Sequence, residues 1–272
     1  MQLSLDRIHV QGRRGPLLRL DHLELETGEC VLLAGEPGQG HTALALVLTG
    51  RLAPEAGRVR LLRDDGSQTA QRKELRRRSA VVDLPAVSEP VEAVHVGTVV
   101  AEDLSLARRT AWPGVPVKWL SAHRLASLER NRVDTLPGAV RTALLTALAA
   151  ERKGVRFLVL SLPDRHGGDP SQWWAVAQAY ATVGYGVLVQ CGLSSARDLG
   201  ATLPPPAHGS DQRTTPLEAM RLRPQRDAHQ HDGAAAPPPA ADIVDTIWLF
   251  GAPPAGEAHL GPQAPQRREQ ER

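Results

Sequence analysis

The sequence predicts an α/β fold, in which buried strands form a central sheet with flanking helices. Three observations lead to this prediction. Short apolar runs such as ECVLLAG and VRFLVLSLP are typical of fully buried strands. They alternate with longer segments whose apolar residues recur every three or four positions, which is typical of helices. The first of these runs ends in a glycine-rich turn that opens a helix, the context that a phosphate-binding loop requires.

The composition fits one medium-sized domain with an aliphatic core. The chain has 272 residues, of which 42% are hydrophobic and 3% aromatic. Its net charge of +2 gives no general attraction to nucleic acid or acidic lipid, so no nucleic-acid partner is expected. Apolar runs are too short to span a bilayer and the N-terminus does not resemble a signal peptide, so we expect a cytoplasmic protein. Cys30 and Cys191 lie in or beside apolar runs and predict reduced core thiols.

The N-terminal part is predicted to be rich in strands. Two segments alternate between apolar and polar residues, and three are short apolar or alternating runs: residues 3–10, 17–26, 29–35, 57–62 and 79–85. A helix is expected to begin at His41. Residues 71–78 are strongly basic, and we interpret them as a solvated helix face rather than a nucleic-acid contact.

The middle of the chain is predicted to be mainly helical and then to return to buried strands. Helices are expected over residues 96–109, 117–131, 139–153 and 169–184, and strands over residues 155–163 and 185–192. Asp169 or Ser171 is expected to cap the last of these helices. Trp173 and Trp174 lie in that helix, and we expect them to pack it against the sheet rather than to form a stacking platform for bases.

The character of the sequence changes from about residue 201. Residues 201–241 are rich in Pro, Ala, His and Gly without an apolar period, which predicts a flexible insertion. His229 and His231 lie in it, but without Cys or carboxylate partners they give little support for a metal site. The run ADIVDTIWLFGA then predicts another strand, and residues 253–272 a disordered tail.

The turn before His41 has most features of a phosphate loop. Gly35, Gly38, Gly40 and Thr42 match the pattern G-x-x-x-x-G-K-[ST], except that His41 replaces the lysine. The glycines allow backbone N–H groups to converge on phosphate oxygens, whereas a largely neutral imidazole cannot replace the lysine ammonium. The residues predicted to bind nucleotide are Gly35, Glu36, Pro37, Gly38, Gly40, His41, Thr42 and Ala43. A tight glycine turn without a ligand remains an alternative.

The order and spacing of these segments resemble the nucleotide-binding subunit of ATP-binding cassette (ABC) transporters. TLPGAVRTALLTALA stands where that family has its signature and helix, RFLVLSLP where it has the Walker B strand, and GVLVQCG where it has the switch strand. VHVGTVVAEDLSLA resembles the family's T-V-x-E-N-L helix. The resemblance implies a P-loop NTPase of ABC type, with a mixed central sheet, an N-terminal antiparallel β part and a helical subdomain. It implies one domain over residues 1–252, with the helical subdomain at about 84–140.

The resemblance also implies that most catalytic positions are degenerate. The Walker B aspartate and glutamate fall on Ser161 and Leu162, and the switch histidine on Gly192, or on Cys191 if the register slips by one. The signature falls on a run whose serine position is a proline: Leu136, Pro137, Gly138, Ala139 and Val140. The loop glutamine falls near Asp83, so the expected Mg²⁺ ligands are Thr42 and Asp83. No residue is assigned a catalytic role, and we expect Asp164 and Asp169 to act as capping or loop residues rather than as substitutes.

Three functions remain open at this point. The first is a transporter cassette that still binds ATP and Mg²⁺ weakly, with little or no hydrolysis. The second is a non-catalytic scaffold or regulator that docks on a permease or on an active cassette. The third is an unrelated P-loop kinase or GTPase-like protein. For the first two, the resemblance implies a membrane permease as partner, a homodimer or a heterodimer with another cassette, and a location at the inner face of the membrane.

Overall fold

The computed structural model describes residues 1–13, 15–202 and 218–220. The strands are β1 (Gln2–Gly12), β2 (Gly15–Glu26), β3 (Cys30–Ala34), β4 (Ala56–Leu62), β5 (Gln68–Thr69), β6 (Ser79–Val82), β7 (Phe157–Ser161), β8 (Gly186–Cys191) and β9 (Glu218–Met220). The α-helices are α1 (His41–Leu48), α2 (Arg72–Arg78), α3 (Val96–Leu106), α4 (Val115–Ala122), α5 (Gly138–Ala150), α6 (Pro170–Thr182) and α7 (Leu193–Asp198). Three short 3₁₀ turns complete the set: η1 (Ala126–Leu128), η2 (Val133–Thr135) and η3 (Pro163–His166).

Two sheets organise the described part of the chain. The N-terminal sheet is antiparallel, with strand order β2-β1-β4-β5. The central sheet has the order β6-β7-β8-β3-β9, with β6, β7, β8 and β3 parallel and β9 antiparallel to β3. The predicted mixed central sheet with an antiparallel N-terminal part is therefore confirmed. Strands β7 and β8 are buried along their whole length and mainly apolar because helices cover both faces of the sheet.

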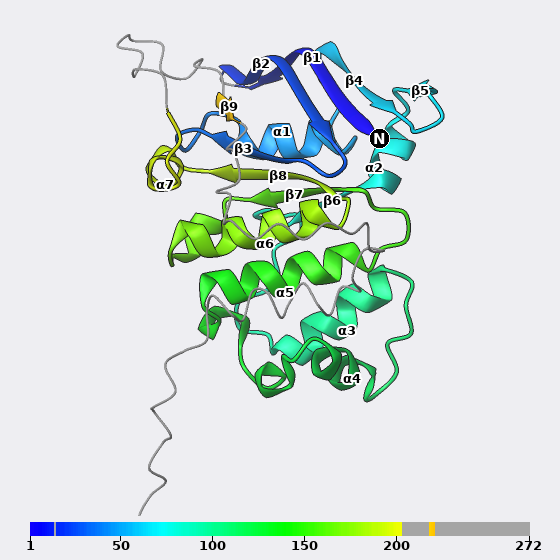
Figure 1. Cartoon of the computed structure of the whole chain (residues 1–272), viewed down its shortest axis with the longest axis vertical. Coiled ribbons are helices and arrows are strands. Elements are labelled where there is room, and N and C mark those ends of the chain that lie inside the picture. The colour runs from blue at the N-terminus through cyan, green and yellow to red at the C-terminus, as the bar shows by residue number, and fades with distance from the viewer. Residues whose placement is uncertain (14, 203–217, 221–272) are drawn as a thin grey trace, which may run out of the picture.

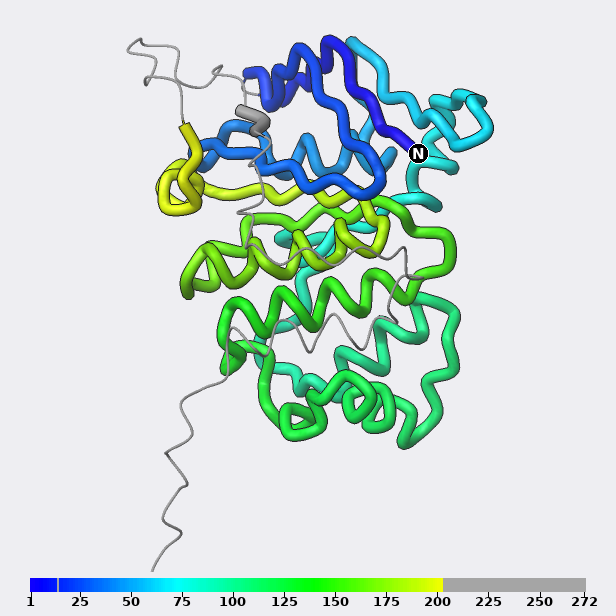
Figure 2. Tube along the Cα trace, in the orientation of Figure 1, coloured from blue at the N-terminus to red at the C-terminus, as the bar shows by residue number. Residues whose placement is uncertain are grey.

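The layers are visible in Figure 1, where α1 lies between the two sheets and α6 and α5 cover the opposite face of the central sheet. Helices α3 and α4 form a further layer beyond α5, and the trace in Figure 2 follows the same order. The apolar core has two clusters to match. One lies around α1 between the sheets, and the other joins α5 and α6 to the helices beyond them. Trp173 and Trp174 are both buried in the second cluster, as expected for packing residues.

Several expectations need correction or lie beyond the described residues. The helix expected over 117–131 ends at Ala122, because His123 ends the helical hydrogen bonding and Arg124 has a left-handed backbone with φ of 55°. A short strand, β9, lies within the expected flexible insertion and pairs with β3. His229, His231, the strand expected at the end of the insertion and the tail lie outside the described residues. The domain limits of 1–252 and 84–140 remain predictions.

Two smaller expectations hold in the structure. Asp169 caps α6, since its side chain accepts a hydrogen bond from the backbone N–H of Ser171 at 2.8 Å. Cys30 and Cys191 are free cysteines, and burial raises the pKa of Cys191 to about 12, so it is a thiol near neutral pH. Among the described helices, none combines the length and apolar character needed to cross a membrane.

Candidate functional site

The predicted phosphate loop lies at the junction of a central strand and a helix. β3 ends at Ala34, the loop follows, and α1 begins at His41. Because β6, β7, β8 and β3 are parallel, their carboxyl ends meet at one edge of the sheet, where open α/β sheets bind their ligands. The loop lies at this edge and the segments that follow β6, β7 and β8 start from it, so the positions assigned to different motifs meet in space.

The backbone of the loop suits an anion. Gly38 and Gly40 have φ of 94° and 98°, which side-chain-bearing residues rarely adopt. A Cβ on Gly40 would lie 2.3 Å from the carbonyl oxygen of Leu17 in β2, so this position must stay glycine for steric reasons as well. The N–H groups of His41, Thr42 and Ala43 precede the first intrahelical bond, which Leu44 donates to the Gly40 carbonyl at 2.8 Å. They are therefore available to a ligand, and Thr42 is exposed beside them.

His41 is built into the protein rather than extended into the loop. Its side chain is only 4% exposed, and its Nε2 atom has no hydrogen-bond partner. Burial lowers the pKa of the imidazole, which outweighs the opposing effects of a hydrogen bond with the Cys191 backbone and of the Asp164 charge. A neutral ring is the result at physiological pH, and it provides no cation for a phosphate.

The strand end below the loop is uncharged. Ser161 ends β7 and is 2% exposed, with its Oγ atom unpartnered. Leu162 follows in a left-handed conformation, with φ of 48° and ψ of 57°, and its N–H donates to the Gln190 carbonyl at 3.0 Å. Neither side chain has a carboxylate that could bind a metal or polarise a water molecule. The positions expected to be degenerate therefore lie at the edge where the family has its chemistry.

Gln190 connects this strand end to the loop. It is fully buried in β8 as the sheet partner of Ser161, and its Nε2 donates to the His41 carbonyl at 2.8 Å. Its Oε1 atom is unpartnered. We call His41, Ser161 and Gln190 the neutral floor of the loop, because three uncharged side chains there each carry one unpartnered buried atom. The sequence analysis did not single out Gln190, although a glutamine inside an apolar strand run is a visible signal.

Asp164 holds the segment in which the switch histidine is expected. Its Oδ2 atom accepts hydrogen bonds from the N–H of Gly192 at 2.7 Å and from the hydroxyl of Ser195 at 3.0 Å. The same oxygen would lie 3.2 Å from a Cβ on Gly192, so a larger residue there would crowd it. Asp164 thus caps the start of α7, which is the structural role expected from the sequence rather than a catalytic one.

The signature-like turn packs on its own chain. Pro137 is exposed and has no N–H to donate. Gly138 is buried at the start of α5, and a Cβ there would lie 2.5 Å from the carbonyl oxygen of Gly167. The backbones of the signature-like turn and of the segment after β7 are therefore in close contact, which only glycine permits.

Asp83, at the end of β6, forms the centre of a buried ionic cluster. Arg141 in α5 is 1% exposed and binds Asp83 with two parallel hydrogen bonds, Nε to Oδ2 at 2.9 Å and Nη2 to Oδ1 at 3.0 Å. Its third nitrogen, Nη1, donates to Glu92 at 2.9 Å. Such a fork fixes both distance and orientation. The helix that follows the signature-like turn is thereby attached to the central sheet.

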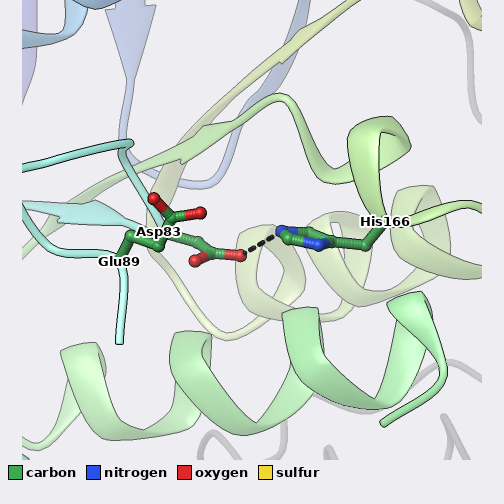
Figure 3. A group of neighbouring side chains, drawn as sticks. All are labelled: Asp83, Glu89 and His166. Atoms are coloured by element: carbon green, nitrogen blue, oxygen red, sulfur yellow. Dashed lines mark ion pairs between the residues drawn. The ribbon is translucent and has the colours of Figure 1, made fainter. Parts of the chain in front are cut away.

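Arg165 and His166 in η3 complete this cluster from the other side. The Nη2 atom of Arg165 lies 3.0 Å from Asp83 and 2.9 Å from Glu89. The Nε2 atom of His166 lies 2.8 Å from Asp83, the contact drawn in Figure 3, and 2.9 Å from the Nε of Arg165. A single Nε2 atom either donates to Asp83 or accepts from Arg165, so the tautomer of His166 decides which bond forms.

These contacts leave Asp83 poorly suited to Mg²⁺. Burial alone raises the pKa of Asp83, but hydrogen bonds from His166 and Arg141 and the charges of Arg165 and Arg141 outweigh it and lower the pKa to about 2. The carboxylate is ionised, yet its oxygens are already bound by cations. Asp83, Glu89 and His166 lie close enough to surround a metal ion, but Arg165 already pairs with an oxygen of Asp83 and an oxygen of Glu89. The expected Mg²⁺ role of Asp83 is therefore not supported by its contacts.

Sequence reasoning missed Arg141, Arg165 and His166. Arg141 has one available signal, since an arginine interrupts the apolar stripe of a helix that is otherwise buried. Arg165 and His166 follow a buried strand, where polar residues often point across the sheet edge. Their shared partner could not be read from the sequence, because Asp83 is 58 positions from Arg141.

Comparisons with known proteins agree with this geometry. A family model described as ABC transporter matches residues 18–144. Two curated relatives from Pseudomonas aeruginosa, both named phosphonates import ATP-binding protein PhnC, are 39% identical over 106 residues, which is 36% of this chain. That match spans 39% of the length of each relative, or about two-fifths.

Solved structures with the same fold cover more of the chain. A nucleotide-free ATP-binding cassette from an ABC transporter has a TM-score of 0.55 at 16% identity, over 73% of this chain and 85% of the other. An ATP-binding subunit of an ABC transporter has a TM-score of 0.51 at 17% identity, over 72% and 82%. At these identities the likeness shows the fold alone. The partial family-model match and the likeness in fold both agree with the resemblance seen in the sequence.

Proposed function

We propose that this chain, a cassette of the ABC transporter type, is the ATP-binding subunit of a membrane importer and binds nucleotide weakly with little or no hydrolysis. The observation that carries the proposal is the neutral His41 at the loop position where a lysine is required, above a strand end made of Ser161 and Leu162. Import is suggested by the relatives, which are named for phosphonates. Their names suggest a phosphonate or a similar small anion as the transported substrate.

Weak turnover follows from the chemistry of phosphoryl transfer. That reaction depends on neutralising charge at the phosphates and on positioning the attacking water. Loss of one such group commonly costs about 10²–10³ in rate, and here several are replaced at one site. The rate losses from the individual replacements are not additive, but one or two of them are enough to remove useful turnover.

A first experiment measures hydrolysis and binding together. Purified full-length chain is assayed for phosphate release from ATP with Mg²⁺, and for binding of a fluorescent ATP analogue. We expect no release above background, weak binding, and about tenfold tighter binding for His41→Lys, because an ammonium then reaches the phosphates. Hydrolysis by the unchanged chain that is lost in His41→Ala contradicts the proposal.

Two exposed valines support the transporter role. Val87 and Val91 are 51% and 68% exposed in the segment between β6 and α3. Exposed apolar side chains that share one loop segment are candidates for a protein contact. We therefore place the permease contact at this segment, beside the Asp83 cluster.

Membrane fractionation of tagged chain in its host tests this contact. We expect part of the chain to sediment with membranes, and Val91→Arg to release it. The matched control is Leu17→Arg, which changes an exposed apolar side chain of β2 and should leave sedimentation unchanged. Equal sedimentation of the unchanged chain and of both variants would argue against the placement of the contact.

A scaffold without nucleotide is the second candidate, and one observation favours it. In an active pair the signature of one chain faces the nucleotide of the other. Here Pro137 has no N–H, and Gly138 packs against the Gly167 carbonyl of its own chain. Failure to bind any nucleotide in the first experiment, together with retained membrane sedimentation, would favour the scaffold over the weak ATP-binding subunit.

A further inference from the structure

We infer that nucleotide bound at this loop is held without Mg²⁺, by backbone N–H groups and the start of α1, and that ATP and ADP bind about equally well. The inference rests on the proposed nucleotide binding and specifies its cofactor requirement. The family resemblance implies Mg²⁺ at this site. Thr42 offers one exposed hydroxyl, but the carboxylates that the structure places at this edge are already bound and do not fit the ion. That disagreement carries the inference.

Mg²⁺ requires oxygen ligands, usually with one or two carboxylates beside the phosphates. Asp83 and Asp164 are the carboxylates that follow β6 and β7 at the sheet edge. Asp83 is bound by the fork of Arg141 and also contacts Arg165. Asp164 accepts two hydrogen bonds that hold the start of α7. Releasing either carboxylate to a metal would leave buried partners unsatisfied, which is costly.

The neutral floor has the donor set of a water site rather than a metal site. Gln190 Oε1 is an acceptor, and Ser161 Oγ carries one hydroxyl proton. His41 Nε2 is an acceptor when the ring proton is on Nδ1. Neutral acceptors and a hydroxyl are groups that buried water commonly satisfies. All three residues are at least 96% buried, and none is an anion that would compensate a divalent charge.

The backbone of the loop and of the start of α1 can still bind a phosphate. The three free N–H groups at the start of α1 and the positive φ of Gly38 and Gly40 form a concave anion site. These donors reach the phosphates nearest the helix, as in other phosphate loops. A phosphate loop recognises the terminal phosphate through its lysine, the metal and the switch residue. In this chain His41 replaces the lysine, neutral side chains stand where the metal ligands are expected, and Gly192 replaces the switch residue. ATP therefore has no advantage over ADP.

Glu36 is the one acidic side chain within residues 35–42, and it is exposed. If it bound Mg²⁺, nucleotide affinity would depend on it. If it only repels phosphate, Glu36→Gln should bind ATP and ADP slightly more tightly, with or without metal. This variant therefore separates a metal ligand from a repulsive charge.

Calorimetric titration of the full chain with ATP and with ADP, each in EDTA and in excess Mg²⁺, tests the inference. We expect the four dissociation constants to agree within about threefold. If Mg²⁺ tightens nucleotide binding by about tenfold or more, the inference is overturned but the proposed ATP-binding subunit is left intact. This holds whether or not Glu36→Gln removes the effect. Absence of binding under all four conditions overturns both, so the two failures are distinguishable.

A gain of metal dependence provides a second test. His41→Lys with Ser161→Asp restores the ammonium and the strand-end carboxylate, and we expect Mg²⁺ to tighten ATP binding about tenfold in this double variant. His41→Lys with Ser161→Asn has nearly the same shape without the charge and should stay independent of Mg²⁺. Thermal unfolding checks that both variants are folded. Equal Mg²⁺ dependence in the two folded variants would show that the strand end does not control the metal, against the inference.

Discussion

The two ends of the same sheet edge are built in opposite ways. After β6, the Asp83 carboxylate is paired with Arg141, Arg165 and His166. At β7 and β8, below the phosphate loop, Ser161 and Gln190 are uncharged and have unpartnered atoms. A nucleotide enzyme needs charge at the loop. Among the described residues, the buried ionic cluster lies instead at the junction of the sheet with α5, where it attaches that helix to the sheet.

The largest expected effect comes from breaking the ionic cluster. Arg141→Met leaves Asp83 buried without its fork, and we expect the free energy of unfolding to fall by about 3–5 kcal/mol. Denaturant unfolding followed by circular dichroism measures it. Arg109→Met is the control, since Arg109 also donates two hydrogen bonds to one carboxylate, both to Oε2 of Glu151, but its side chain is 60% exposed. Its loss should cost about 0–1 kcal/mol. Equal stability of Arg141→Met and the unchanged chain would show that the cluster does not hold α5.

Acid should weaken the same cluster. The pKa of Asp83 is lowered from 3.8 to about 2, so its contribution to stability is present above about pH 4 and is lost as pH falls toward 2. The loss amounts to about 2 kcal/mol. Asp83→Asn should be less stable at pH 7 but should lack this part of the acid dependence. Unfolding curves at several pH values measure both. If the unfolding free energies of the unchanged chain and of Asp83→Asn depend on pH in the same way, the acid effect does not come from Asp83.

Arg165 should matter less than Arg141. Its side chain is 20% exposed, and its Nη1 atom is buried without a partner, so some of its ionic gain is offset. For Arg165→Met we expect a loss of about 1–2 kcal/mol in unfolding free energy. A loss as large as that of Arg141→Met would mean that η3, not α5, is the main support of Asp83.

The smallest effect is expected at the neutral floor. Ser161→Ala removes a buried hydroxyl without a partner, and we expect a change within about 1 kcal/mol of zero in either direction. Thermal unfolding is sufficient to measure it. A loss above about 2 kcal/mol would show that the hydroxyl is bonded in solution, and the contrast between the two ends would weaken.

The strands and the loop could be predicted because their signals are local. The run before Gly35 and the glycines up to Gly40 fix a strand, a turn and a helix within a few residues. The order of motifs then predicted that Ser161 would lie at the same edge. The ionic cluster could not be predicted in this way. A carboxylate at residue 83 is a plausible metal ligand until Arg141 is known to pack against it, and no local pattern records that contact.

The lack of a local signal for tertiary contacts also explains why α4 ends before residue 131. Residues 117–131 have a helical period, but Arg124 adopts a left-handed backbone so that the chain can turn toward η1. Tertiary packing here overrides propensity. Asp169, in contrast, acts within two residues of itself as a helix cap, and its role was predicted correctly.

The turn η3 has a consequence for how sequence change can be tolerated. Asp164 holds the start of α7, while the next two residues hold the end of β6. Deleting or inserting one residue in this turn would displace all three side chains at once, and two distant segments would lose their anchor together. Length variation should therefore be rare here among close homologues, while substitutions that preserve spacing remain acceptable.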